Sequence, residues 1–130
     1  MPTATEVAHA LYSRWNENRL AELADRLDPA IELICDPLRP EESALRGIEG
    51  WQQWVARWEA TYEEMHINVD GLVPVDSEHV LALISITAKR RGRQHEPLNW
   101  AAAHLWTVRD GLIARWETHL DLGAARRTLD

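Results

Sequence analysis

Residues 98–120 read LNWAAAHLWTVRDGLIARWETHL. The Asp110-Gly111 pair in the middle is a strong signal for a two-residue hairpin turn. The segments on either side, Leu98–Val108 and Leu112–Leu120, are apolar enough to be β-strands. This stretch therefore predicts a β-hairpin near the C-terminal end of the chain.

Two more strands are predicted before this hairpin. Residues 65–75 alternate between apolar and polar, and Asp70-Gly71 within them predicts a bulge or a sharp bend. Residues 80–88 are almost continuously apolar, which is typical of a strand covered on both faces. The charged residues 89–97 predict the turn that leads into the hairpin.

The N-terminal half has mainly helical patterning. Thr3 and Glu6 have capping-box spacing, and a helix is predicted over residues 5–18. A shorter helix over 20–27, a strand over 31–35, an irregular loop over 37–47 and a third helix from Ile48 follow. A short last helix is predicted over 122–129. This order predicts an α+β fold, with the helices gathered on one face of a strongly bent antiparallel sheet.

Composition limits what the chain can be. Its 130 residues make one domain, 1–130, and the single cysteine, Cys35, excludes an internal disulfide. The net charge of −7 disfavours nucleic acid and anionic membranes as partners. The sequence has no membrane-spanning run, secretory signal or metal-ligand spacing, so we expect a cytoplasmic protein without metal or other cofactor.

The aromatic residues are unusual, with seven Trp, two Tyr and no Phe. Tryptophan suits partly solvated pocket walls and interfaces better than a fully buried core, because its indole N–H requires a hydrogen-bond partner. This usage favours a protein that encloses a ligand or pairs with another chain.

Three segments carry a resemblance to a known family. They are Trp15-Asn16-Glu17-Asn18, the loop from Asp36-Pro37 to Arg46-Gly47-Ile48, and the hairpin from Asp110 to Trp116. Through them the chain resembles the nuclear transport factor 2-like superfamily, and within it the SnoaL-like polyketide cyclases and ketosteroid isomerases. The resemblance implies a cone-shaped molecule, in which the sheet wraps around three helices of the N-terminal half and leaves a deep, mostly apolar pocket.

The resemblance also suggests Asp36 as a catalytic base. In ketosteroid isomerases an aspartate before proline at this place moves a proton beside a carbonyl. A carboxylate at the mouth of an apolar cavity suits that chemistry, because desolvation raises its pKa toward the working pH. The alternative is that an Asp-Pro pair only begins a turn.

Other catalytic groups of the superfamily are replaced. The isomerases place a tyrosine and a protonated acid where this sequence has Leu11 and Ala103, and Tyr12 lies one residue from the tyrosine position. The epoxide hydrolases would need an Arg and two Asp at the places of Ser85, Thr87 and Thr118. Steroid isomerisation and epoxide hydrolysis by the family mechanisms are therefore not predicted. Asp121, at the end of the last strand, is either an acid toward the pocket or a helix cap.

If the last hairpin is regular, its register determines which side chains of the two strands face the interior. Alternation then points Asn99, Ala101, Ala103, Leu105 and Thr107 inward, together with Ala114, Trp116, Thr118 and Leu120. Trp100, His104 and Trp106 would point outward, and exposed tryptophans on a sheet face predict a homodimer through that face. The alternative is that these tryptophans cover a neighbouring loop. His66 faces outward unless the register of its strand slips by one residue.

These observations favour a cofactor-free isomerase, cyclase or lyase. Its substrate would be a small apolar metabolite with a carbonyl group, such as a polyketide. Asp36 would be the base, and the residues predicted to contact the substrate are Tyr12, Trp15, Trp54, Trp58, Asn99, Trp116 and Thr118. The alternative is a module of the same fold that binds a hydrophobic ligand, or a partner protein, without chemistry.

Overall fold

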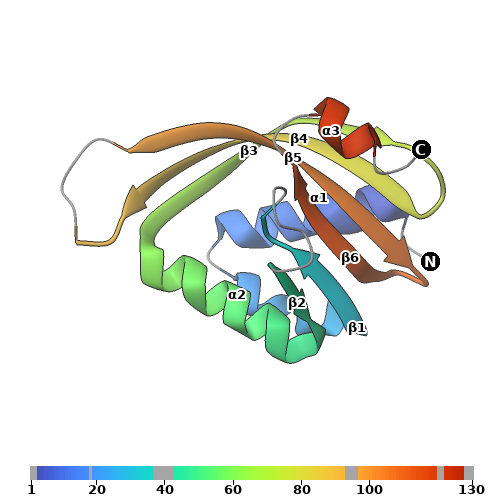
Figure 1. The fold of residues 1–130 in the computed structure, drawn as a ribbon, viewed down its shortest axis with the longest axis horizontal. Coiled ribbons are helices and arrows are strands. Elements are labelled where there is room, and N and C mark those ends of the chain that lie inside the picture. Colours follow the sequence, from blue (N-terminus) through green and yellow to red (C-terminus); the bar gives the residue numbers. More distant parts are fainter. Residues whose placement is uncertain (1–2, 18, 37–42, 93–96, 120–121, 128–130) are drawn as a thin grey trace.

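A computed structural model describes residues 3–17, 19–36, 43–92, 97–119 and 122–127 (Figure 1). Its helical elements are α1 (Ala4–Asn16), the 3-10 helix η1 (Leu20–Arg26), α2 (Gly47–Thr61) and α3 (Leu122–Arg127). Its strands are β1 (Leu27–Ile34), β2 (Ala44–Arg46), β3 (Tyr62–Pro74), β4 (His79–Arg90), β5 (Leu98–Arg109) and β6 (Leu112–His119). The predicted α+β class is confirmed. No helix in the described ranges is long and apolar enough to cross a membrane.

The six strands form one open sheet in the order β2-β1-β6-β5-β4-β3. All neighbouring strands are antiparallel except β1 and β6, which are parallel, so the expectation of a purely antiparallel sheet is wrong at this pair. The chain can make this parallel pair because the whole of α2 and β3–β5 lies between the two strands, which is ample length for a crossover. Strand β2 falls in the segment predicted to be an irregular loop.

The sheet separates two apolar clusters. On its concave side it curves over α1 and α2, whose buried residues include Leu11, Trp15, Trp51 and Trp54 (Figure 1). On its convex side α3 covers a smaller cluster in which Ala125 packs near Leu81, Ala103 and Leu105. Strand β4 contributes to both clusters, which explains its long apolar run.

Both ends of α1 are fixed by side chains. Thr3 is the N-cap, and its hydroxyl accepts the backbone N–H of Glu6 at 3.1 Å, as the capping-box spacing predicts. At the other end Asn16 bonds both main-chain groups of Ile67, with its Oδ1 accepting at 2.7 Å and its Nδ2 donating at 2.8 Å. Because β3 is an edge strand, Asn16 occupies hydrogen-bonding groups that no further strand would satisfy.

Within the described strands, four irregularities alter the register of the sheet, and two of them bear on the predictions. In β3 the pairing with β4 skips Asp70, between Val69 and Gly71, as the Asp-Gly pair predicted. In the last hairpin Val108 pairs with Ile113 but Thr107 pairs with Arg115, so Ala114 is an extra residue. A one-residue bulge reverses which side chains of one strand share a face with those of the other.

Candidate functional site: the aromatic interior of the cone

The bulge at Ala114 overturns the predicted faces of β5. Trp106 lies opposite Trp116, and both are buried on the concave side. Trp100, His104 and Trp106 therefore face the helices, with His104 2% exposed and Trp106 fully buried. The prediction that these three residues form an exposed dimer face is wrong. Whether two copies pair stays a prediction, and any such contact would use other residues.

The predicted inward face of Asn99 is wrong for the same reason. It is exposed at the start of β5, and its Oδ1 accepts a hydrogen bond from Thr87 Oγ1 at 2.8 Å on the outer side of the sheet. Its predicted contact with a ligand in the interior is therefore not supported. Thr118, opposite His104 across the β5/β6 ladder, is half-buried and shares the concave face with Trp116.

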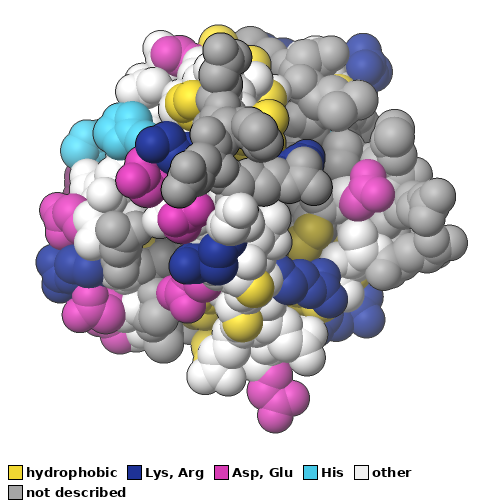
Figure 2. All heavy atoms as spheres, turned by 90° about the vertical axis from the view of Figure 1, so that its left-hand side faces the viewer, with side chains coloured by type: hydrophobic (Ala, Val, Ile, Leu, Met, Phe, Trp, Pro, Cys, Tyr) yellow, Lys and Arg dark blue, Asp and Glu magenta, His cyan; other side chains and the backbone are white. Residues whose placement is uncertain are grey.

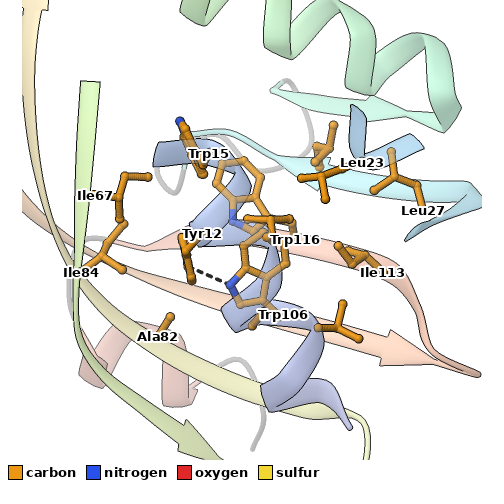
Figure 3. Close-up of a cluster of buried hydrophobic side chains, with 14 of the residues drawn as sticks. Tyr12, Trp15, Leu23, Leu27, Ile67, Ala82, Ile84, Trp106, Ile113 and Trp116 are labelled. Atoms are coloured by element: carbon orange, nitrogen blue, oxygen red, sulfur yellow. Dashed lines mark hydrogen bonds between the residues drawn. The ribbon is translucent and has the colours of Figure 1, made fainter. Parts of the chain in front are cut away.

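At the centre of the concave face three side chains form a buried hydrogen-bonded chain. Trp106 Nε1 donates to the Tyr12 hydroxyl at 2.8 Å, which Figure 3 shows, and Tyr12 Oη lies 2.6 Å from His104 Nδ1. The Tyr12 ring comes from α1, and the other two come from adjacent inward positions of β5. Tyr12 was predicted at the site but His104 was not, because the register of a regular hairpin pointed His104 outward.

Burial fixes the protonation of this chain. Desolvation, with a smaller contribution from the charge of His119, lowers the pKa of His104 to about 3, so the imidazole is neutral near pH 7. Desolvation also raises the pKa of Tyr12 far above its ordinary value, although the hydrogen bond from Trp106 opposes this. A neutral Tyr12 has one proton, and donating it to His104 Nδ1 leaves the imidazole proton on Nε2.

The indole of Trp116 lies beside this chain. Its ring centroid is 4.9 Å from that of His104 and 4.8 Å from that of Trp54. Trp116 Nε1 is buried and has no hydrogen-bond partner among the described residues, and the same is true of Trp51 Nε1. A buried N–H without an acceptor is costly, and such groups are candidates for binding a ligand acceptor.

Further aromatic rings connect this centre with the surface. The ring centroid of Trp15 lies 5.1 Å from that of Trp54 and 5.9 Å from that of Trp58, both in edge-to-face geometry. The ring centroids of Trp58 and Tyr62 are 5.0 Å apart. A cavity of about 70 Å³ opens beside these rings, lined also by Met65. The predicted deep pocket is therefore largely filled by aromatic side chains, and open space remains at its mouth. Tyr62 and Met65 were not predicted as site residues, since both lie near the start of a strand rather than on a recognised motif.

Asp36 lies two residues beyond the end of β1 and is half-buried. Its backbone N–H donates to Ser43 Oγ at 2.9 Å, and Ser43 Oγ donates to its carbonyl at 3.3 Å. The preceding residue, Cys35, packs against the concave cluster, and this partial burial raises the pKa of its thiol. Asp36 thus follows directly after a residue of the interior, but its role as a base stays a prediction.

Two larger hollows have no tryptophan or tyrosine among the described residues that line them, and the second shares Met65 with the cavity beside the rings. One of about 360 Å³ is lined by Glu6, Val7, Ala10, Leu23, Arg26 and Ile113. Another of about 200 Å³ includes His66, which is exposed as predicted. Asp121 lies outside the described residues. No group of three or more His, Cys, Asp or Glu side chains within the described ranges is arranged to hold a metal ion.

The fold belongs to the nuclear transport factor 2-like class. A protein of unknown function with this fold from Burkholderia pseudomallei superposes with a TM-score of 0.77 at 15% identity, covering 98% of this chain and 97% of the other. A protein described as a SnoaL-like polyketide cyclase from a Jannaschia species gives a TM-score of 0.77 at 17% identity, with 97% and 92% covered. A protein with a ketosteroid isomerase-like fold from Catenulispora acidiphila, solved in complex with trimethylamine, gives a TM-score of 0.72 at 20% identity, with 94% of this chain and 90% of the other covered.

The family is defined by the sequence. Residues 8–116 match the profile of the SnoaL-like domain, so the chain belongs to the SnoaL-like family. No functionally curated protein matches the sequence. At these low identities the solved structures establish the fold and leave the activity open.

Proposed function

We propose that this protein is a cofactor-free enzyme of the isomerase or cyclase type that acts on a small, apolar, carbonyl-containing compound. The proposal rests on the buried N–H of Trp116, which has no acceptor among the described residues and lies beside the neutral His104 in an aromatic interior. Membership of the SnoaL-like family supports it. The trimethylamine complex of the Catenulispora acidiphila protein supports the binding of small organic molecules by this fold.

The chemistry would be proton transfer next to the carbonyl. Asp36 would remove a proton from the adjacent carbon, and the negative charge would then develop on the carbonyl oxygen. Trp116 Nε1–H and His104 Nε2–H are neutral donors in a water-poor interior, where hydrogen bonds to a developing charge are strongest. Tyr12 would position His104 by holding its Nδ1 as an acceptor. Trp15, Trp54, Trp58 and Thr118 would surround the rest of the substrate.

Solvent-proton exchange tests this proposal without knowledge of the final product. Cyclic 1,3-diketones and hydroxylated aromatic ketones in D₂O are followed by NMR for loss of the proton next to the carbonyl. We expect the wild type to accelerate exchange and Asp36→Asn to lose roughly 100-fold or more of that acceleration. Trp116→Phe, which keeps a ring without the N–H, should lose about 100-fold. Asp25→Asn is the control, since its side chain is 71% exposed.

A non-catalytic ligand-binding module is the second candidate. It is favoured by the aromatic side chains that fill most of the concave interior and leave a cavity of about 70 Å³ at its mouth. If compounds quench the tryptophan fluorescence of the wild type but none exchanges its proton faster, this second candidate is correct. If exchange is accelerated equally by the wild type and Asp36→Asn, the protein is an enzyme with another base.

A further inference from the structure

The cavity at the mouth of the aromatic interior has a distinctive lining. It lies where the end of α1 and the end of α2 meet the start of β3, and its volume is about 70 Å³. A cavity of about 150 Å³ holds the six heavy atoms of benzene, so this one encloses about three heavy atoms of a group whose remainder lies in the open mouth. Its lining consists of three aromatic residues, two apolar residues and two acids: Trp15, Trp58, Tyr62, Val55, Met65, Glu59 and Glu63.

The rings of Trp15, Trp58 and Tyr62 form a corner, and Trp100 packs against one side of it. Trp15 and Trp58 meet at an interplanar angle of 75°, whereas Tyr62 is inclined by only 32° to Trp58 and extends that side of the corner. Trp100 stacks behind Trp58, with the planes 6° apart. Trp15 Nε1 donates to Met65 Sδ at 3.1 Å, so this N–H already has a partner. The corner therefore offers π surface and few free donors.

The acidic side chains give this corner its charge. Glu59 and Glu63 are both exposed, and neither forms a salt bridge with another described residue. Glu63 Oε1 accepts only the backbone N–H of Gly92, at 3.2 Å.

The guanidinium of Arg91 donates to the main-chain carbonyls of Glu59 and Tyr62 at 2.9 and 3.1 Å. Among the described residues that line the cavity, only Glu59 and Glu63 are charged, so the lining itself is negative. Figure 2 shows the side of the molecule on the left of Figure 1, where acidic and basic side chains alternate and apolar surface appears only in small patches.

We propose that this cavity binds a small organic cation, namely a methylated ammonium group. Aromatic faces attract such a cation through the ring quadrupole, and its methyl groups gain from contact with Val55 and Met65. The carboxylates add an attraction that a neutral group of the same shape would not feel, and they repel an anion. This inference is independent of the reaction proposed above, because an ammonium group can occupy the mouth whether or not Asp36 acts as a base.

Tetramethylammonium chloride is the probe, and tert-butanol is the neutral compound of similar shape. Binding is followed by the indole N–H signals of uniformly ¹⁵N-labelled wild-type protein during titration at constant ionic strength. We expect tetramethylammonium to shift a subset of these signals saturably, and tert-butanol to bind at least about threefold more weakly. Trp58→Leu should weaken binding of the cation roughly threefold to thirtyfold.

The charge contribution is tested with exposed residues, whose substitution leaves the core intact. The double variant Glu59→Gln/Glu63→Gln should weaken tetramethylammonium binding severalfold. Glu64→Gln removes the same kind of charge from the next residue of β3, outside the cavity and paired with Lys89, and should leave binding unchanged. The proposal is overturned if tetramethylammonium gives no saturable shift or if tert-butanol binds with equal affinity. It is also overturned if the double variant and Glu64→Gln have equal effects.

Discussion

The hydroxyl of Tyr12 offers the sharpest test of the buried hydrogen-bonded chain. Tyr12→Phe keeps the ring and removes one oxygen, which leaves the N–H of Trp106 without an acceptor and Nδ1 of His104 without a donor. Each unsatisfied buried group costs about 1–3 kcal/mol, so the two together should lower the free energy of unfolding by about 2–6 kcal/mol.

The melting temperature gives a second measure. The unfolding entropy of a chain of 130 residues is roughly 0.27 kcal/mol/K, and a free-energy loss near the middle of that range lowers Tm by about 15 °C. Urea unfolding followed by circular dichroism gives the free energy, and calorimetry gives Tm.

The other tyrosine of the chain is the matched control. Tyr62 is half-buried and its hydroxyl makes no hydrogen bond with any described residue, so Tyr62→Phe should cost less than about 0.5 kcal/mol. A loss below 1 kcal/mol for Tyr12→Phe, or equal losses for both variants, would refute the buried chain.

Three further predictions concern the same framework. The pKa of about 3 for His104 means that only the unfolded chain takes up its proton as the pH falls from 6.5, so stability should decrease by roughly 1.4 kcal/mol per pH unit through this group. His104→Gln should remove that slope in urea titrations between pH 7 and 5, and an unchanged slope would contradict the assignment. Asn16→Ala should lower the free energy of unfolding by about 1–3 kcal/mol, because two hydrogen bonds to Ile67 are lost. A smaller loss in urea unfolding would contradict this prediction. Deleting Ala114 should abolish cooperative thermal unfolding, since the hairpin can no longer bury Trp106 of β5 and Trp116 of β6 on the same face. A native near-ultraviolet circular dichroism spectrum of this variant would show that the bulge is dispensable.

Local signals were sufficient for most of the architecture. The Thr3 cap, the helical period around Trp51 and the Asp110-Gly111 turn each depend on neighbours in the sequence, and the structure contains all three. The bulge at Asp70 was also visible, because Asp-Gly in a strand favours an irregular backbone. The parallel pairing of β1 with β6 had no such signal, because it joins segments at opposite ends of the chain.

The interior shows the same division between local and distant information. Tyr12, Trp15, Trp54 and Trp116 were predicted to face inward, and all four lie on the concave side. Trp58 packs at its margin. Asn99, Trp100, His104 and Trp106 were assigned to the opposite faces, and Ala114 explains why. A regular two-residue turn would have put Thr107 opposite Ala114, and the bulge puts it opposite Arg115 instead.

The sequence by itself therefore determined most of the elements, their order and the identity of the aromatic residues that fill the cone, but not strand β2, which lies in the segment predicted to be a loop. Only the tertiary structure decided which face of β5 carries Trp106 and His104. The physical reason is that side chains alternate with a period of two, so one extra residue in the partner strand exchanges inside for outside along the whole strand. Alanine at the bulge leaves no local signal, and burying two tryptophans against α1 and α2 selects the register.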